Sequence, residues 1–239
     1  MNVAALIPAL NAADTLADVI VRTRAVVPAV WVVDDGSSDA TAQVAEEAGA
    51  TVVRHPVNQG KGAALRTGTD ALLRAGVTGV LTLDADGQHL PEELPKLLAA
   101  CGLSAEGAGT PTADIVLGSR AELFTGMTPY RRFANRVSSR LISFAAGQPL
   151  EDIQTGFRFY SQSVLEQLGF PGSRFEAESA VVVLAARRGF QICSTPIRLQ
   201  VAAGEETSHY RSLQDSLRIA RAVFSARFGS LSRTPLREP

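Results

Sequence analysis

Leu83-Asp84-Ala85-Asp86-Gly87-Gln88-His89 follows the apolar run Gly79-Val80-Leu81-Thr82 directly. The apolar run favours an extended strand, and the glycine lets the chain turn back after it. Residues two apart in an extended segment face the same side, so the carboxylates of Asp84 and Asp86 can converge. With the amide oxygen of Gln88 they form a set of hard oxygen donors suited to Mg²⁺ or Mn²⁺. A solvated turn is the alternative interpretation, because Asp and Gly are common turn residues.

Outward from this segment, short apolar strands alternate with helical patterns. Strands are expected at residues 3–7, 30–33, 51–54 and 79–83, and helices at 14–26, 40–48 and 61–74. This alternation is typical of a parallel sheet covered on both faces. Pro8 is expected to end the first strand, and Asp14 to cap the first helix. The sequence therefore predicts an α/β fold with a Rossmann-like, mostly parallel central sheet and helices on both faces.

The second half of the chain has a looser pattern. Helices are expected at residues 91–100, 130–146, 176–188 and 213–228, and extended segments at 114–117, 190–194 and 196–201. Residues 151–158 are expected to form a polar turn. In the helix 130–146 the side chains predicted to face inward are Phe133, Val137, Leu141, Ile142 and Phe144. The last helix is amphipathic and basic, with Phe224 on its apolar side, which predicts either docking on the core or contact with an anionic membrane surface.

Composition narrows the class of protein. The chain has 239 residues, 46% of them hydrophobic, and a net charge of −1, which argues against nucleic-acid binding. No apolar run reaches the roughly 20 residues that span a bilayer. Cys101 and Cys193 form neither a CxxC motif nor a zinc pattern, which indicates buried thiols in a reducing compartment. We therefore expect a cytoplasmic protein whose membrane contact, if any, is peripheral.

Polar groups follow three of the expected strands. Pro8-Ala9-Leu10-Asn11, Asp34-Asp35 and Asp84-Ala85-Asp86 each come directly after an apolar strand. In an open α/β sheet such groups share the carboxyl edge, where ligands bind. The sequence thus predicts that acids far apart in the chain meet in one crevice. An alternative role for Asp34, Asp35 and Asp39 is helix capping.

Six stretches of sequence carry a resemblance to a known family. They are IPALNAADTL (7–16), VVDDGSSDAT (32–41), NQGKGAALRTG (58–68), LDADGQH (83–89), IVLGSR (115–120) and DIQTGFRFYS (152–161). The chain resembles the family 2 inverting glycosyltransferases of the GT-A fold, in their dolichyl- or polyprenyl-phosphate sugar synthase branch. The resemblance implies a GT-A domain at 1–201, an acceptor loop with a C-terminal amphipathic helix at 202–228, and a tail at 229–239.

The resemblance implies roles on the donor side. Asp35, with Asp34, would bind the nucleotide, and Asp84, Asp86 and Gln88 would hold Mg²⁺ or Mn²⁺. Further nucleotide contacts would come from Pro8, Leu10, Asn11 and Ala85. The family usually has Tyr at the position of Leu10 and Glu at that of Ala12. Without them the base, guanine or uracil, stays open.

The resemblance also implies roles on the acceptor side. Asp152 and Arg120 would be catalytic. Phosphate and acceptor contacts would come from Arg131, Arg132, Gln154, Arg158, Ser208, His209 and Arg211. With a hydroxyl acceptor Asp152 would be the general base, whereas a phosphate acceptor is already an anion and needs none. The segment of Lys61 and Arg66 lacks P-loop spacing, so it is not a phosphate loop of that kind. At the start of a helix both could still help neutralise an anion, but we expect a simple exposed helix start.

Three functions are compatible with these residues. The first is metal-dependent, inverting transfer of a sugar from GDP-mannose or a UDP-hexose to a lipid-linked acceptor, polyprenyl phosphate in particular. The second uses the same donor but a hydroxyl acceptor on a glycan, glycolipid or protein. The third is a non-catalytic nucleotide-binding module. The sequence identifies no protein partner.

Overall fold

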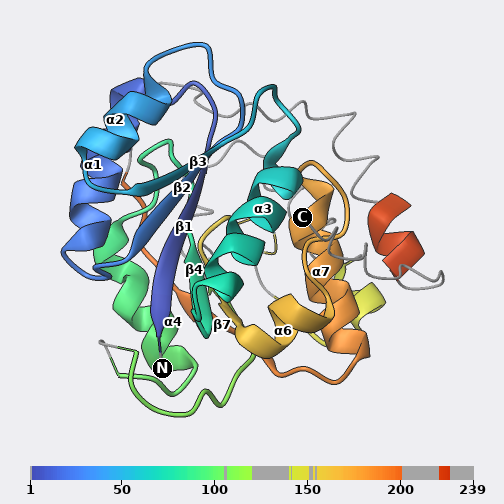
Figure 1. Ribbon diagram of the computed structural model, residues 1–239. Coiled ribbons are helices and arrows are strands. Elements are labelled where there is room, and N and C mark those ends of the chain that lie inside the picture. Colours follow the sequence, from blue (N-terminus) through green and yellow to red (C-terminus); the bar gives the residue numbers. More distant parts are fainter. Residues whose placement is uncertain are drawn as a thin grey trace.

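The central sheet joins segments from the whole length of the chain (Figure 1). The computed structural model describes residues 2–104, 107–119, 140, 142–150, 153, 155–200 and 221–226. Within these ranges the strands are β1 (Val3–Ala9), β2 (Val30–Asp34), β3 (Thr51–Arg54), β4 (Gly79–Thr82), β5 (Ile115–Ser119), β6 (Arg158–Ser161) and β7 (Ile192–Pro196). Their order across the sheet is β3-β2-β1-β4-β6-β5-β7. All neighbouring strands are parallel except β6, which is antiparallel to both β4 and β5.

Helices cover both faces of this sheet (Figure 1). One face packs against α1 (Ala13–Arg24), α2 (Thr41–Glu47) and α4 (Leu94–Ala100), which a 3₁₀ turn at Pro91–Glu93 precedes. The other face packs against α3 (Lys61–Arg74), α6 (Gln162–Gln167) and α7 (Glu176–Arg187). Strand β1 serves both layers, because Leu6 faces the α3 side and Ile7 the α1 side. The predicted α/β fold with helices on both faces is confirmed.

Pro8 does not end the first strand, as the sequence had suggested. Strand β1 continues to Ala9, and Pro8 pairs in register with Val33 of β2. Pairing of β1 with β4 stops at Leu6, whose carbonyl accepts a bond from the Leu83 amide. Proline has no amide hydrogen to extend the ladder on that side. The chain after β4 is therefore free to leave the sheet and form the acidic turn.

The start of α1 is capped by another element and not by Asp14. Asp14 lies in the first turn of the helix, and the N-cap position is Ala12. The Ala12 amide donates to Thr41 Oγ1 at 2.8 Å, and the Ala13 amide donates to Asp39 Oδ2 at 3.2 Å. These bonds satisfy amides that a helix leaves without internal partners. They also tie α1 to the turn before α2.

Strand β6 and helix α6 were not predicted from the sequence. The turn expected at 151–158 gives way to β6 at Arg158, and β6 runs antiparallel between β4 and β5. Phe159 and Tyr160 are fully buried, one on each face of the sheet. The charged Arg158 interrupts the apolar sequence Phe157-Arg158-Phe159-Tyr160, so the sequence did not show the pattern of a buried strand.

Two aromatic side chains lie on the opposite side from the one expected. Phe144 is 78% exposed, whereas Ile142 is buried as predicted. In the helical stretch 221–226, Phe224 is 65% exposed while Val223 and Ala226 are buried. The side of this stretch that faces the core is therefore not the side that the apolar stripe with Phe224 predicted. Among the helices of the described ranges, none is long and apolar enough to cross a bilayer.

Candidate active site

The segments that follow β1, β2 and β4 meet at one edge of the sheet, as predicted. These three strands are parallel neighbours, so their carboxyl ends lie together. The Asp35 amide donates to the Ala9 carbonyl at 2.8 Å, which joins the ends of β2 and β1. Thr15 Oγ1, in the first turn of α1, donates to the Ala85 carbonyl at 2.6 Å. The acidic turn after β4 is thereby fixed beside the polar groups of the other two strand ends.

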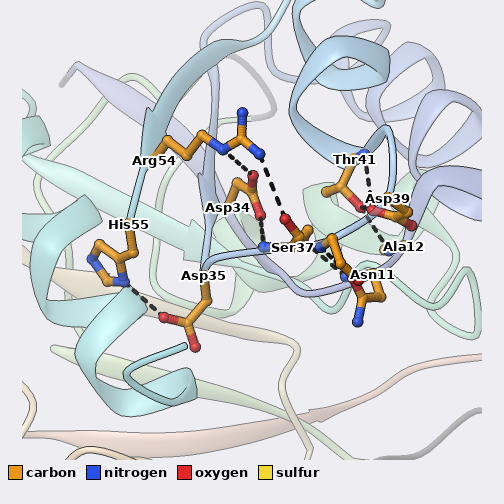
Figure 2. Close-up of polar contacts among 10 residues, drawn as sticks. Asn11, Ala12, Asp34, Asp35, Ser37, Asp39, Thr41, Arg54 and His55 are labelled. Carbon is orange, nitrogen blue, oxygen red and sulfur yellow. Dashed lines mark hydrogen bonds and ion pairs between the residues drawn. The ribbon is translucent and has the colours of Figure 1, made fainter. Parts of the chain in front are cut away.

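Asp34 is buried at this edge of the sheet, next to a pocket. The residue is fully buried, and its Oδ1 accepts a bond from the Ser37 amide at 2.9 Å. Its Oδ2 forms an ion pair with Arg54 Nε at 3.1 Å (Figure 2). A pocket of about 310 Å³ opens next to this pair, lined by Gly36, Ser37, Arg54, His55 and Pro56. The lining offers the Arg54 guanidinium and the His55 ring to a polar ligand.

Asp35 is an anchor for the loop before α3. Its Oδ1 accepts the Gln59 amide at 2.9 Å and contacts His55 Nδ1 at 2.7 Å, and its Oδ2 accepts the Gly60 amide at 2.7 Å. In Figure 2 the Asp35 carboxylate turns toward His55, whereas Asp34 turns toward Arg54. The chain itself thus occupies the oxygens that were expected to bind the nucleotide. Gly36 is needed beside it, since a Cβ there would lie 2.5 Å from the Val57 backbone.

Asn11, Leu10 and Pro8 border the same edge. Asn11 adopts a positive φ of 49°, a conformation that asparagine tolerates better than most residues. Its Oδ1 accepts the Ser38 amide at 2.9 Å, and its own amide donates to Ser37 Oγ at 2.9 Å. Asn11 therefore fixes the turn after β2 (Figure 2). Leu10 and Pro8 are both half-buried there.

The acidic turn after β4 presents Asp84 and Asp86 at this edge. Asp84 Oδ1 forms an ion pair with Lys61 Nζ at 2.6 Å. Asp86 Oδ1 accepts the Gln88 amide at 3.0 Å, which closes the turn through Gly87 at a φ of 72°. The Gln88 carbonyl accepts a bond from the Gln200 amide at 2.9 Å, so the turn is also tied to the chain after β7.

The charges of this turn suit a divalent cation. Partial burial raises the pKa of Asp86, and the neighbouring negative charge of Asp84 raises it further. Two adjacent carboxylates are hard oxygen donors of the kind that Mg²⁺ and Mn²⁺ prefer. In the described part of the chain, no group of three or more His, Cys, Asp or Glu side chains is arranged to hold a metal. A dication at Asp84 and Asp86 would therefore need further ligands of another kind, such as the predicted Gln88 amide oxygen, water or a bound substrate.

Lys61 and Glu178 belong to the same site, although the sequence had placed Lys61 at an exposed helix start. The Lys61 side chain is only 16% exposed and bridges Asp84 and Glu178 Oε2, the latter at 2.8 Å. Its ammonium also lies 5.8 Å from the centre of the Phe175 ring. Burial alone would lower the pKa of Lys61, but the two carboxylates outweigh it and raise the pKa. The lysine in the NQGKG motif could have identified Lys61 as a site residue from the sequence, whereas no motif identified Glu178.

His89 and the segment after residue 154 pack against the acidic turn from the other side. His89 stacks on Phe157 with ring centres 5.3 Å apart, and its Nδ1 lies 3.8 Å from Asp84 Oδ2. Thr155 Oγ1 lies 3.4 Å from His89 Nε2. A Cβ on Gly156 would lie only 2.3 Å from Asp84 Oδ2. The backbone of this segment therefore touches the carboxylate that is the first metal candidate.

Arg158 does not face an acceptor, contrary to its expected role. It is 1% exposed, and its guanidinium donates to the carbonyls of Ile153, Thr155 and Glu178 and to the Tyr160 hydroxyl. Burial alone would lower the pKa of Arg158, but the Tyr160 and Glu178 oxygens outweigh it and raise the pKa. Burial raises the pKa of Tyr160 to about 12. Arg158 is thus part of the core and contacts the site through the backbone.

The remaining predicted site residues cannot be placed. Arg120, Arg131, Arg132, Asp152, Gln154, Ser208, His209 and Arg211 lie outside the described residues. The structure therefore brings together the donor-side residues of the prediction, and the acceptor-side roles stay predictions from sequence.

Sequence comparison assigns the family. Residues 4–169 match the model of glycosyl transferase family 2. The undecaprenyl-phosphate mannosyltransferase of Micrococcus luteus is 32% identical over 82% of this chain and 83% of that protein. The polyprenol monophosphomannose synthase of Mycolicibacterium smegmatis is 32% identical over 80% of this chain and 75% of that protein. The glycosyltransferase AglJ of Haloferax volcanii is 34% identical over 80% of this chain, which spans only 60% of AglJ.

Solved structures show the same fold at lower identity. The glucosyl-3-phosphoglycerate synthase of Mycobacterium tuberculosis, in complex with phosphoglyceric acid, matches with a TM-score of 0.70 and 19% identity over 95% of this chain and 80% of that chain. Its complex with Mn²⁺, UDP and glucosyl-3-phosphoglycerate matches with a TM-score of 0.65 and 20% identity over 94% of this chain and 78% of that chain. With its GT-A architecture and the match over residues 4–169, the chain belongs to glycosyl transferase family 2 and is a glycosyltransferase.

Proposed function

We propose that this chain is a metal-dependent, inverting glycosyltransferase that moves a sugar from a nucleotide-sugar to polyprenyl phosphate at the cytosolic face of a membrane. The observation that carries the proposal is the meeting of Asp84 and Asp86 with the pocket beside Asp34 at one sheet edge. The names of the Micrococcus and Mycolicibacterium relatives support a polyprenyl-phosphate acceptor. The Mn²⁺ and UDP in a structural neighbour support the metal and the donor class.

On the donor side, the pocket lined by Ser37, Arg54 and His55 takes the base. Arg54 is held by the buried Asp34, so its guanidinium is available to a base carbonyl without moving. Asp84, Asp86 and Gln88 would hold the dication beside the donor's diphosphate. A dication bound there would supply positive charge to stabilise the departing diphosphate without any proton transfer.

On the acceptor side, a phosphate oxygen attacks the anomeric carbon. The new bond joins that carbon to the phosphate, and the bond to the nucleotide diphosphate breaks with its electron pair leaving on the diphosphate. A single displacement of this kind inverts the anomeric configuration. Because the phosphate is already an anion, it needs no general base. Asp152 then orients the acceptor, with Arg120, Arg131 and Arg132 and the loop residues Gln154, Ser208, His209 and Arg211 holding its phosphate.

A nucleotide screen tests the donor half. We expect UDP or GDP to raise the melting temperature in the presence of Mn²⁺ and to lose that effect when EDTA is added. The nucleotide that succeeds identifies the base. The isosteric variant Asp84→Asn should abolish the shift, whereas Asp114→Asn, an acid at the far end of the sheet, should keep it. A shift of equal size in Asp84→Asn would contradict the metal role.

A transfer assay tests the acceptor half. With the matching nucleotide-sugar, we expect the wild-type protein to glycosylate polyprenyl phosphate in detergent and to give the inverted anomer by NMR. The variant Asp152→Asn should lose no more than about tenfold in turnover if the acceptor is a phosphate. A loss on the order of 10³-fold or more would indicate a hydroxyl acceptor that needs Asp152 as its base. A product with retained configuration would contradict the single displacement.

A further inference from the structure

Arg158 makes contacts that a merely structural arginine does not need. Its Nε donates to the Thr155 carbonyl and its Nη2 to the Ile153 carbonyl, each at 2.7 Å. Its Nη1 donates to the Glu178 carbonyl at 2.6 Å and to the Tyr160 hydroxyl at 3.1 Å. Two of its bonds thus hold the backbone on both sides of residue 154. Ile153 directly follows Asp152, the predicted acceptor-side acid.

The same short segment is fastened to the donor side. Thr82 Oγ1, on the strand next to Arg158, donates to the Gly156 carbonyl at 2.9 Å. Gly156 lies against the Asp84 carboxylate so closely that a Cβ would not fit. On its other side Arg158 lies near Glu178, which pairs with Lys61, and Lys61 pairs with Asp84. Ile153, Thr155 and Gly156 are therefore held between the metal candidate Asp84 and a chain of ion pairs.

Only arginine supplies these bonds together. Its planar guanidinium has five donors in a fixed fork, whereas a lysine ammonium is a point charge with three. A buried charge is also costly unless it is fully paired, so Arg158 would not persist in the core without such partners. The Glu178 side chain supplies the nearest negative charge, with Oε1 at 4.0 Å from Arg158 Nε.

We propose that Arg158, aided by Thr82, is a positioning residue that holds the backbone of Ile153, Thr155 and Gly156, the segment next to the acceptor-side acid Asp152 in the sequence, beside the metal-side acid Asp84. The inference rests on the proposed function, because it assigns Asp152 to the acceptor. Arg158 touches neither substrate nor metal and acts through the backbone of residues 153–156. Its removal should therefore impair transfer to the acceptor and spare nucleotide binding.

The test compares Arg158→Lys with two controls. Lysine keeps the positive charge and loses the fork. Tyr160→Phe removes one partner of Arg158 but leaves its three carbonyl bonds, and it should behave like the wild type. Leu165→Ala, in α6 and 2% exposed, removes buried volume away from the site and should lower the melting temperature. Each protein is assayed for melting temperature, for nucleotide affinity with Mn²⁺, for turnover with polyprenyl phosphate, and for amide exchange over residues 153–157.

In Arg158→Lys we expect turnover to fall by about 10- to 100-fold, the scale of a small misplacement of reacting groups. Its nucleotide affinity should stay within about threefold of the wild type, and amide exchange over 153–157 should accelerate. Leu165→Ala should lose stability and keep turnover. If Arg158→Lys matches Leu165→Ala in turnover, or if its segment exchanges as in the wild type, the inference is overturned.

A second variant covers the case in which Arg158→Lys does not fold. Thr82→Val removes the bond to Gly156 with almost no change in volume. We expect turnover to fall a few-fold and amide exchange over residues 153–157 to accelerate, with nucleotide affinity unchanged. Unchanged exchange and turnover in Thr82→Val would then overturn the inference. A wild-type protein that transfers no sugar would instead contradict the proposed function, so the two failures are distinguishable.

Discussion

At the scale of single residues, ionisation of Asp86 lowers the stability of the folded protein. Burial, and then the negative charge of Asp84, raise the pKa of its carboxyl group. A raised pKa means that the native state favours the protonated acid. The corresponding stability is present at low pH and is lost as the pH rises through the folded-state pKa. At neutral pH the ionised Asp86 therefore destabilises the protein when no cation is bound.

We predict that Asp86→Asn raises the melting temperature at pH 7 in EDTA. Asparagine removes the charge and keeps an oxygen for the Gln88 amide. Each kcal/mol of relief corresponds to a rise of about 2–4 °C in a domain of this size. The gain should shrink as the pH falls from 7 toward 4, because the raised pKa lets wild-type Asp86 bind a proton increasingly over this range. Calorimetry across this pH range measures the difference in melting temperature between the variant and the wild type. A variant less stable than the wild type at pH 7 would contradict the prediction.

The same variant should lose its response to Mn²⁺ with nucleotide, because the amide oxygen carries no charge. A more stable protein that no longer binds its ligand would be a trade-off of the kind common at functional sites. Asp39→Asn is a suitable control. The bonds that Asp39 accepts from Thr41 and the Ala13 amide outweigh burial and lower its pKa, so its substitution should destabilise the fold.

The residues of the site differ in how far sequence alone could identify them. Asp84, Asp86 and Asp34 follow strands, and the geometry of parallel sheets predicts where they meet. The roles of Lys61 and Arg158 depend instead on contacts with α7, which lies far away in the chain. A charged residue in a motif does not reveal whether it faces solvent or the core.

Among the elements, the segment after β7 (residues 197–200) is tied by one buried acid to the 3₁₀ turn that follows the acidic turn. Glu93 is 1% exposed, and its carboxylate accepts from Arg198 Nη2 at 2.8 Å and from Lys96 Nζ at 2.5 Å. Leu199 then bridges to His89, and the Gln200 amide donates to the Gln88 carbonyl. Glu93 therefore helps to fix residues 197–200 where they reach the acidic turn.

We predict that Glu93→Gln destabilises the protein by about 1–3 kcal/mol, the cost of breaking charged hydrogen bonds at a buried group. Burial alone would raise the pKa of Glu93, but Lys96 and Arg198 outweigh it and lower the pKa. A lowered pKa means that this stability is present at neutral pH and is lost as the acid is protonated. The difference from the wild type should therefore shrink below about pH 4.5.

Urea unfolding at pH 7 and pH 4 measures this difference. Glu92→Gln is the matched control, because Glu92 pairs with Arg22 at 2.8 Å but its side chain is 51% exposed. An exposed pair of this kind contributes less than about 1 kcal/mol. Equal effects of the two substitutions would show that burial of Glu93 does not matter.

Elements with a regular pattern were predictable, and elements defined by their neighbours were not. Helix α3 spans Lys61–Arg74 as expected, since its apolar period and the glycines around it are local signals. Strand β6 depends on β4 and β5, which pair with it on both sides. The side of a helix that faces inward also depends on tertiary packing, which is why Phe144 lies outside while Ile142 lies inside.

In the molecule as a whole, β4 and β6 form the junction between two parts of the sheet. The parallel strands β3, β2, β1 and β4 carry the donor-side groups, and β6 introduces the segment with Gly156 and Arg158. The cross-strand pair Thr82–Arg158 lies at this junction. The sheet thus joins the donor-side strands to the segment with Gly156 and Arg158 through backbone pairing.

The rate at which the two thiols react reports on the stability of the whole molecule. Cys101 is fully buried at the end of α4, and Cys193 lies on β7 with Sγ 3.7 Å from the Ala100 carbonyl. Both are free thiols. Burial raises the pKa of Cys101 to about 11 and also raises that of Cys193. Since the thiolate is the reactive form, both should react slowly while the protein is folded.

We predict that Cys101, in a Cys193→Ser background, is labelled at pH 8 only through unfolding. Mn²⁺ with the matching nucleotide at about 100 times its Kd should then slow labelling by about 100-fold, because binding to the native state adds about 2.7 kcal/mol. The same protein in urea, which should label at the rate of a free thiol, is the control. Mn²⁺ without nucleotide separates the contribution of the metal. Labelling that a stabilising ligand leaves unchanged would mean that α4 and β7 open locally, independently of the sheet edge that binds the nucleotide.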